Sequence, residues 1–127
     1  MPTILLVEDN LLNKELIAIF VKGMYELDHA IDGYAAITMA NQKVYEAILM
    51  DINLKSDMDG IQAASEIKQL PGYQEVPIAA VTGYTSATDV KRIMNSDCTY
   101  YLGKPFDKGS LLNLIREMLQ KRALNWA

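Results

Sequence analysis

Five short apolar runs alternate along the chain with longer stretches in which apolar residues recur at helical spacing. The runs cover residues 4–7, 25–30, 47–50, 78–81 and 100–102. Three of them are continuous rather than alternating, which is typical of parallel strands covered on both faces. Glu26 and Asp28 interrupt the second run and favour an edge strand there. The alternation therefore predicts an α/β domain of the (βα)5 type with a doubly wound parallel sheet.

The stretches between the runs carry the signals of helix starts. Residues suited to the N-cap precede four of them, namely Asn10, Asp32, Asp59 and Ser86. A fifth helix is expected to begin near Asp107 and to end near Arg122. In the first helix, the apolar residues Leu12, Leu16 and Phe20 are predicted to face the sheet.

The composition fits one domain that spans residues 1–127. A chain of this length, half of it hydrophobic, buries roughly two-thirds of its unfolded surface and needs no disulfide or structural metal. Its only cysteine, Cys98, cannot form an internal disulfide. The net charge of −4 argues against a protein that coats nucleic acid or an anionic membrane. No apolar run approaches the roughly 18 residues of a membrane span, so the expected compartment is the cytoplasm.

Polar residues follow directly after the apolar runs. Glu8 and Asp9 end the first run, Asp51 the third and Thr82 the fourth, and Lys104 comes shortly after the fifth. In a parallel sheet the carboxyl ends of all strands lie along one edge, where ligands bind. We therefore expect these five side chains to gather at one site.

The three acidic residues of this set point to a metal. Carboxylates as close together as those of Glu8, Asp9 and Asp51 are predicted to oppose joint ionisation unless a cation lies among them. An oxygen-only ligand set at a partly hydrated site favours Mg²⁺. His29 and Cys98 lie on other segments, so zinc has no support, and His29 is expected to be an edge residue without a role.

The remaining residues complete a site for an anion beside the metal. Lys104 supplies a positive charge and Thr82 a hydroxyl, which together with a metal can neutralise a phosphoryl group. A carboxylate can act as the nucleophile in phosphoryl transfer. Asp51 stands alone at the end of a central strand and is the predicted acceptor.

These residues resemble the receiver domain of two-component response regulators, in particular the single-domain receivers of the chemotaxis-regulator type. The motifs that carry the resemblance are Leu6-Val7-Glu8-Asp9-Asn10, Asp51-Ile52-Asn53, Met58-Asp59-Gly60, Thr82-Gly83 and Lys104-Pro105-Phe106. Each is weak alone, but together and in this order they are specific. The resemblance implies a flavodoxin-like sheet with strand order 2-1-3-4-5.

The resemblance also implies roles for single residues. Glu8, Asp9, Asp51 and the backbone carbonyl of Asn53 would hold Mg²⁺. Asp51 would accept the phosphoryl group, Thr82 would hydrogen-bond it and Lys104 would pair with it. Tyr101 would be a switch residue that turns inward when Thr82 moves, and the Lys104–Pro105 peptide would be cis.

The implied function is two-component phosphorelay signalling rather than enzymatic turnover. A histidine kinase or a histidine phosphotransfer protein would donate the phosphoryl group, which would be lost again by slow autodephosphorylation. The face formed by the fourth helix, fifth strand and fifth helix would then bind a downstream protein. No direct nucleic-acid or membrane contact is expected, and a homodimer is left open. The sequence is compatible with a stand-alone receiver or with a piece of a larger regulator or hybrid kinase.

Two departures from the family pattern affect the surroundings of the site. Lys55 stands where most members have proline, and Met58-Asp59-Gly60 comes one residue later than usual, which predicts a differently shaped loop. Asn53 and Tyr84 occupy positions that tune the lifetime of the phosphoryl group in the family.

Two other functions remain as alternatives. A receiver-like scaffold that is never phosphorylated would be favoured if one of the site residues were missing, and none is. Phosphatases with an aspartate nucleophile carry the pattern Asp-x-Asp, in which the first acid is the nucleophile and the second is the acid–base catalyst. Here Asn53 fills that second place, which disfavours the phosphatase.

Overall fold

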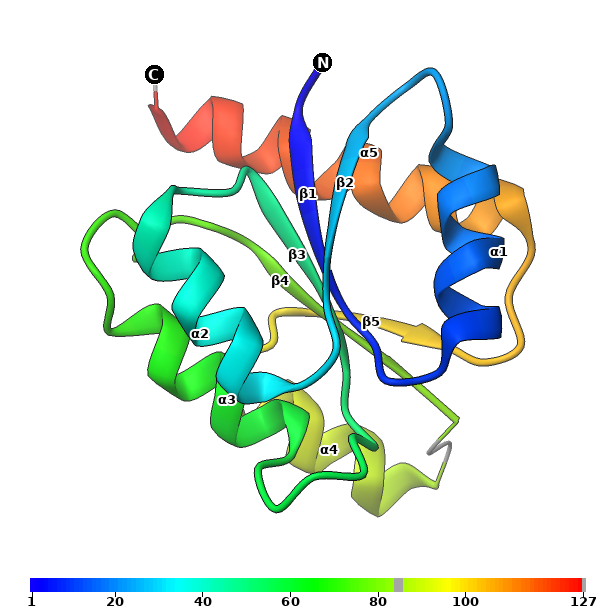
Figure 1. The fold of residues 1–127 in the computed structure, drawn as a ribbon, viewed down its shortest axis with the longest axis vertical. Helices are drawn as coiled ribbons and strands as arrows, with labels where there is room; N and C mark the ends of the chain where they lie inside the picture. The colour runs from blue at the N-terminus through cyan, green and yellow to red at the C-terminus, as the bar shows by residue number, and fades with distance from the viewer. Residues whose placement is uncertain (84–85, 127) are drawn as a thin grey trace.

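A computed structural model shows five parallel strands with a helix after each of them (Figure 1). The structure describes residues 1–83 and 86–126, with side chains up to residue 121. Tyr84 therefore lies outside the described residues. The elements are β1 (Thr3–Val7), α1 (Leu11–Val21), β2 (Glu26–Ala30), α2 (Gly33–Gln42), β3 (Ala47–Asp51), α3 (Gly60–Lys68), β4 (Ile78–Thr82), α4 (Ala87–Met94), β5 (Tyr100–Gly103) and α5 (Lys108–Trp126).

The sheet has the predicted topology. Its strand order is β2-β1-β3-β4-β5, and every neighbouring pair is parallel. The predicted (βα)5 fold and the edge position of β2 are both confirmed. Every residue of β3 and β4 is buried, as expected for central strands covered on both faces.

The two faces of the sheet are covered by different helices, as Figure 1 shows. Alternate strand residues point to opposite faces, so Leu5 and Ile48 pack with residues of α2 and α3, whereas Leu6 and Leu49 pack with residues of α1 and α5. The carboxyl ends of the parallel strands lie along one edge of the sheet, which is where ligands bind in folds of this type.

The helix starts follow the predicted caps. The side chains of Asn10, Asp32, Asp59 and Ser86 each accept a hydrogen bond from a backbone N–H in the first turn of the following helix. These bonds satisfy donors that have no partner within the helix. The last helix is longer than predicted, because α5 continues past Arg122 to Trp126.

The predicted inner face of α1 is wrong for Leu12 and Leu16, whereas Phe20 packs against the core as predicted. Leu12 and Leu16 are 81% and 42% exposed, and Phe20 is only half-buried, whereas Ile17 and Val21 are buried against the sheet. Apolar residues occur all round this helix, so their spacing alone does not single out one face. The stripe of Leu12, Leu16 and Ile19 faces away from the core.

Candidate functional site

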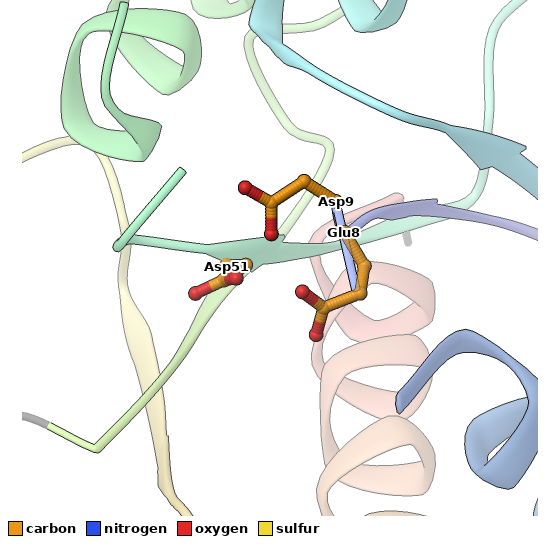
Figure 2. A group of neighbouring side chains, drawn as sticks. All are labelled: Glu8, Asp9 and Asp51. Carbon is orange, nitrogen blue, oxygen red and sulfur yellow. The ribbon is translucent and has the colours of Figure 1, made fainter. Parts of the chain in front are cut away.

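The carboxyl edge of the sheet brings the polar strand ends together. Glu8 and Asp9 follow β1, Asp51 is the last residue of β3, Thr82 is the last residue of β4, and Lys104 follows β5. Figure 2 shows Glu8, Asp9 and Asp51 beside one another at the ends of β1 and β3. The site is thus assembled by the sheet from segments that are up to 96 residues apart in sequence.

The three acidic side chains form a compact cluster. One carboxylate oxygen from each of Glu8, Asp9 and Asp51 lies within 4.8 Å of the others. Glu8 is 1% exposed and Asp51 is 4% exposed, while Asp9 is half-buried at the rim. Buried carboxylates are costly unless they are paired with a cation, and one cation is provided by the chain itself.

That cation is Lys104. Its Nζ lies 3.2 Å from Glu8 Oε1 and 3.7 Å from Asp51 Oδ2, so it bridges the two buried acids. The Lys104 side chain is 25% exposed, so it is only partly shielded from solvent. The peptide bond from Lys104 to Pro105 is cis, as the resemblance implies.

One positive charge does not balance this cluster. Burial, followed by the neighbouring Glu8 carboxylate, raises the pKa of Asp51 from 3.8 to about 7, although Lys104 and the Asn53 N–H act in the opposite direction. The Asp51 carboxyl is therefore partly protonated near neutral pH, and an added cation would displace that proton. The all-oxygen donor set, partly open to water through Asp9, fits Mg²⁺.

Backbone groups around the site hold the carboxylates in place. Asn53 N donates to Asp51 Oδ1 over 3.0 Å, and Asn10 N donates to Glu8 Oε2 over 3.3 Å. Lys55 N donates to Asp9 Oδ2 over 2.8 Å. The last bond ties the loop after β3 to the acidic cluster. The sequence did not predict this contact, because the backbone of Lys55 makes it and not the side chain.

A second contact that the sequence did not predict involves His29 on β2. Its Nε2 lies 2.6 Å from the backbone oxygen of Glu8, and the residue is half-buried. The expected edge position of His29 is confirmed, because β2 is an edge strand. Its side chain, however, contacts the backbone oxygen of Glu8 at the site.

Thr82 and Tyr101 lie on neighbouring strands at the other side of the site. Thr82 is fully buried, and its backbone oxygen accepts a hydrogen bond of 2.8 Å from Lys104 N. Tyr101 pairs with Ala80 on β4, is half-buried and packs against the core cluster beneath α2 and α3. The link between Thr82 and Lys104 connects the ends of β4 and β5 directly.

The start of α3 fits closely against the strand that carries Asp51. Gly60 N donates to the Ile52 oxygen, and a Cβ at position 60 would press on the Asp51 carbonyl and lie 2.8 Å from Ile52 Cα. A capping box between Asp59 and Gln62 fixes this helix start. Gly60 thus allows α3 to approach the backbone of the site.

Comparison with known proteins identifies the class to which this fold and site belong. The family model described as "Response regulator receiver domain" matches residues 4–116. The chain is 36% identical over 114 residues to the signal transduction histidine-protein kinase BarA of Escherichia coli strain K12, covering 89% of this chain but only 12% of BarA. It is 28% identical over 118 residues to the polar-differentiation response regulator DivK of Brucella ovis, covering 92% of this chain and 95% of DivK.

Solved structures agree with this assignment. The receiver domain of the sensor histidine kinase PA1611 from Pseudomonas aeruginosa PAO1, with a magnesium ion coordinated in its active site cleft, has a TM-score of 0.86 and 32% identity over 94% of this chain and 98% of that chain. The Vibrio cholerae chemotaxis protein CheY4 has a TM-score of 0.87 and 25% identity over 94% and 99%. The chain belongs to the response regulator receiver family of two-component systems. In the part of the chain that the structure describes, no helix is long and apolar enough to cross a membrane.

Proposed function

We propose that residues 1–127 form one receiver domain in which Asp51 accepts a phosphoryl group from a phosphohistidine, with Mg²⁺ bound at Glu8, Asp9, Asp51 and the backbone carbonyl of Asn53. The observation that carries the proposal is the position of Asp51, which lies buried between an acidic pair and Lys104. The donor would be a histidine kinase or a histidine phosphotransfer protein. The cytoplasm is the compartment we expect for this exchange.

In the proposed step, a carboxylate oxygen of Asp51 forms a bond to phosphorus while the bond from phosphorus to the donor imidazole nitrogen breaks. The imidazole leaves with the electron pair and takes up a proton from solvent. Because Asn53 N already donates to Asp51 Oδ1 and Lys104 faces Oδ2, the nucleophile is held in one orientation. Bound Mg²⁺ would keep Asp51 ionised and neutralise charge on the transferred group.

Lys104 and Thr82 would stabilise the product. Lys104 Nζ bridges Glu8 and Asp51 in this structure, and after transfer it would pair with a phosphoryl oxygen. The Thr82 hydroxyl, at the end of the neighbouring strand, would hydrogen-bond another such oxygen. Movement of Thr82 would let Tyr101 turn inward and change the face formed by α4, β5 and α5, where we place the downstream protein partner.

Features beside the site favour a protein as donor. A hollow of about 270 Å³ opens next to Lys104, between α1 and the segment after β5. The exposed stripe of Leu12, Leu16 and Ile19 adjoins it, since Leu16 lines the hollow. A contiguous apolar surface of this kind suits a protein contact. A donor that covers it would bring its phosphohistidine towards Asp51.

The alternatives lack comparable support. A phosphatase of the aspartate-nucleophile type would need an acid two residues after Asp51, and Asn53 contributes its backbone N–H there. A scaffold would not need a buried nucleophile whose pKa is raised to about 7, since such a group destabilises the fold at neutral pH. We therefore favour the phosphoacceptor over both.

The test is the intact mass of the protein after incubation with a small acyl-phosphate donor, with Mg²⁺ or with a chelator. We expect a Mg²⁺-dependent gain of one phosphoryl group that is absent in Asp51→Asn. Labelling that persists in Asp51→Asn would refute the assignment of the acceptor. If the folded wild type neither gains mass nor binds beryllium fluoride, which mimics an acyl phosphate without hydrolysing, the scaffold function is favoured instead.

A further inference from the structure

The backbone pairing between β1 and β2 ends at Glu8, the first residue of the acidic pair Glu8–Asp9. The register aligns Leu6 with His29 and Val7 with Ala30, and Glu8 N continues the ladder by donating to the Ala30 oxygen over 3.0 Å. The next backbone group, the Glu8 carbonyl oxygen, contacts a side chain of β2 instead of its backbone: Nε2 of His29 lies 2.6 Å from it. Both backbone polar groups of Glu8 are therefore held by the edge strand.

The chemistry of this contact fixes the direction of the hydrogen bond. A carbonyl oxygen can only accept, so Nε2 of His29 carries the proton and donates. The contact is partly buried, and a hydrogen bond shielded from water contributes more to local order than an exposed one. His29 thus acts here as a directed donor to the backbone of β1.

The held carbonyl belongs to the peptide that joins Glu8 to Asp9. Fixing that peptide fixes the direction in which the chain leaves β1, and with it the position of the Asp9 side chain. The far end of Asp9 is held by Lys55 N over 2.8 Å, while Glu8 is held by Lys104 over 3.2 Å. The side chains of the acidic pair are thus bound to the loop after β3 and to the segment after β5, while the carbonyl of their shared peptide contacts His29.

We propose that His29 is a positioning residue for the metal site: its Nε2–H group anchors the Glu8 carbonyl, orients the Glu8–Asp9 turn and thereby raises the affinity for Mg²⁺. The inference rests on the proposed function, because it assigns His29 to the Mg²⁺ site of the phosphoacceptor. It gives the edge strand β2, which contributes no acidic ligand, a direct part in the site. Groups that orient metal ligands change metal affinity when they are removed.

Two substitutions separate the hydrogen bond from the bulk of the ring. Gln places its side-chain amide nitrogen the same number of bonds from the backbone as Nε2 of His29, so His29→Gln keeps a donor there. Met has a similar length and no donor, so His29→Met removes the hydrogen bond alone. Neither substitution alters a proposed ligand.

The experiment is calorimetric titration of the metal-free protein with Mg²⁺ alone, with urea unfolding to show that each variant is folded. We expect His29→Met to weaken Mg²⁺ binding by about tenfold and His29→Gln to stay within roughly twofold of the wild type. A long-range ¹H–¹⁵N correlation spectrum of the wild type is expected to show a proton on Nε2. A ring protonated only on Nδ1 would refute the proposed bond.

The possible failures can be told apart. If the wild type binds Mg²⁺ and His29→Met binds it equally well, His29 has only a structural role and the inference is wrong. Equal losses of affinity in His29→Met and His29→Gln would also refute it, since the donor would not be the cause. If the wild type binds no Mg²⁺, the proposed function fails at its metal site and the inference fails with it.

Discussion

Asp51 combines two properties that oppose each other in the metal-free protein. It is 4% exposed and lies beside Glu8, so its ionised form is disfavoured and its pKa is raised to about 7. Phosphoryl acceptance requires the ionised form as nucleophile. A bound cation would reconcile the two, because it would favour the carboxylate without exposing it to water. This conflict has a measurable effect on stability.

In metal-free protein, Asp51→Asn is expected to raise the free energy of unfolding at about pH 8 by roughly 2–4 kcal/mol, and to change it little at about pH 4. In the wild type the folded state keeps the Asp51 proton up to about pH 7, whereas the unfolded state releases it near 3.8. The wild type therefore loses stability as the pH rises between these values. Urea unfolding in chelator over this range measures the difference, and a gain independent of pH would contradict the raised pKa.

Gly60 is a second residue whose identity the site requires. The close approach of α3 to the Asp51–Ile52 backbone leaves no room for a Cβ, so Gly60→Ala is expected to lower the free energy of unfolding by about 1–3 kcal/mol. Gly109→Ala is the matched control, because the nearest atom there would be Asp107 Oδ1 at an ordinary 3.6 Å. Chemical denaturation compares the two. If Gly60→Ala changes the free energy of unfolding no more unfavourably than Gly109→Ala does, α3 can shift to accommodate the Cβ without cost.

Side chains that end strands could be predicted from the sequence, whereas contacts made by the backbone could not. Glu8, Asp9 and Asp51 stand out because polar residues end apolar runs and parallel strands converge at one edge. The Lys55 N–H and the His29 ring give no such signal. Their roles depend on loop conformation and on strand register, which local patterns do not specify.

At the level of elements, α1 shows why the orientation of a helix is harder to predict than its existence. Its start follows from local sequence, because Asn10 accepts a hydrogen bond from Asn13 N as expected of an N-cap. Its apolar residues occupy all faces, so burial against the sheet selects Ile17 and Val21 by tertiary packing. The central strands were predicted correctly because they are apolar on both faces. Their prediction therefore does not depend on knowing which face each residue points to.

The corrected face of α1 can be tested by truncation. Ile17 is 1% exposed and Leu12 is 81% exposed. Ile17→Ala is expected to lower the free energy of unfolding by about 2–4 kcal/mol, because it leaves a cavity beneath the helix. Leu12→Ala is expected to change it by less than about 0.5 kcal/mol. Thermal or urea unfolding distinguishes the two, and a larger loss in Leu12→Ala would restore the face predicted from sequence.

At the level of the whole molecule, two different surfaces border the one site. One is formed by the exposed stripe of α1 and the hollow beside Lys104. The other is the face of α4, β5 and α5, which includes the strand of Tyr101 that pairs with the strand of Thr82. In the proposed function, the donor protein contacts the first surface and the downstream partner the second. Donor and partner would therefore meet the phosphoacceptor from different sides.

This division predicts that transfer from a protein and from a small molecule can be separated by one substitution. Leu12→Asp places a charge on the exposed stripe, within the first turn of α1, where an acidic residue suits the helix dipole and the fold is preserved. Phosphoryl transfer from a histidine phosphotransfer protein is expected to slow by about tenfold or more, while uptake from a small acyl phosphate stays within roughly twofold because Asp51 and Lys104 are untouched.

Thr38→Asp on α2 supplies the control, since it adds the same charge to an exposed position on the other helical layer. The measurement is the rate of phosphoryl uptake from each donor in the presence of Mg²⁺, monitored by intact mass. Equal slowing with both donors would mean that Leu12→Asp disturbs the site itself. An unchanged rate with the protein donor would mean that the donor does not contact α1. The phosphohistidine would then approach Asp51 over the loops that follow the other strands.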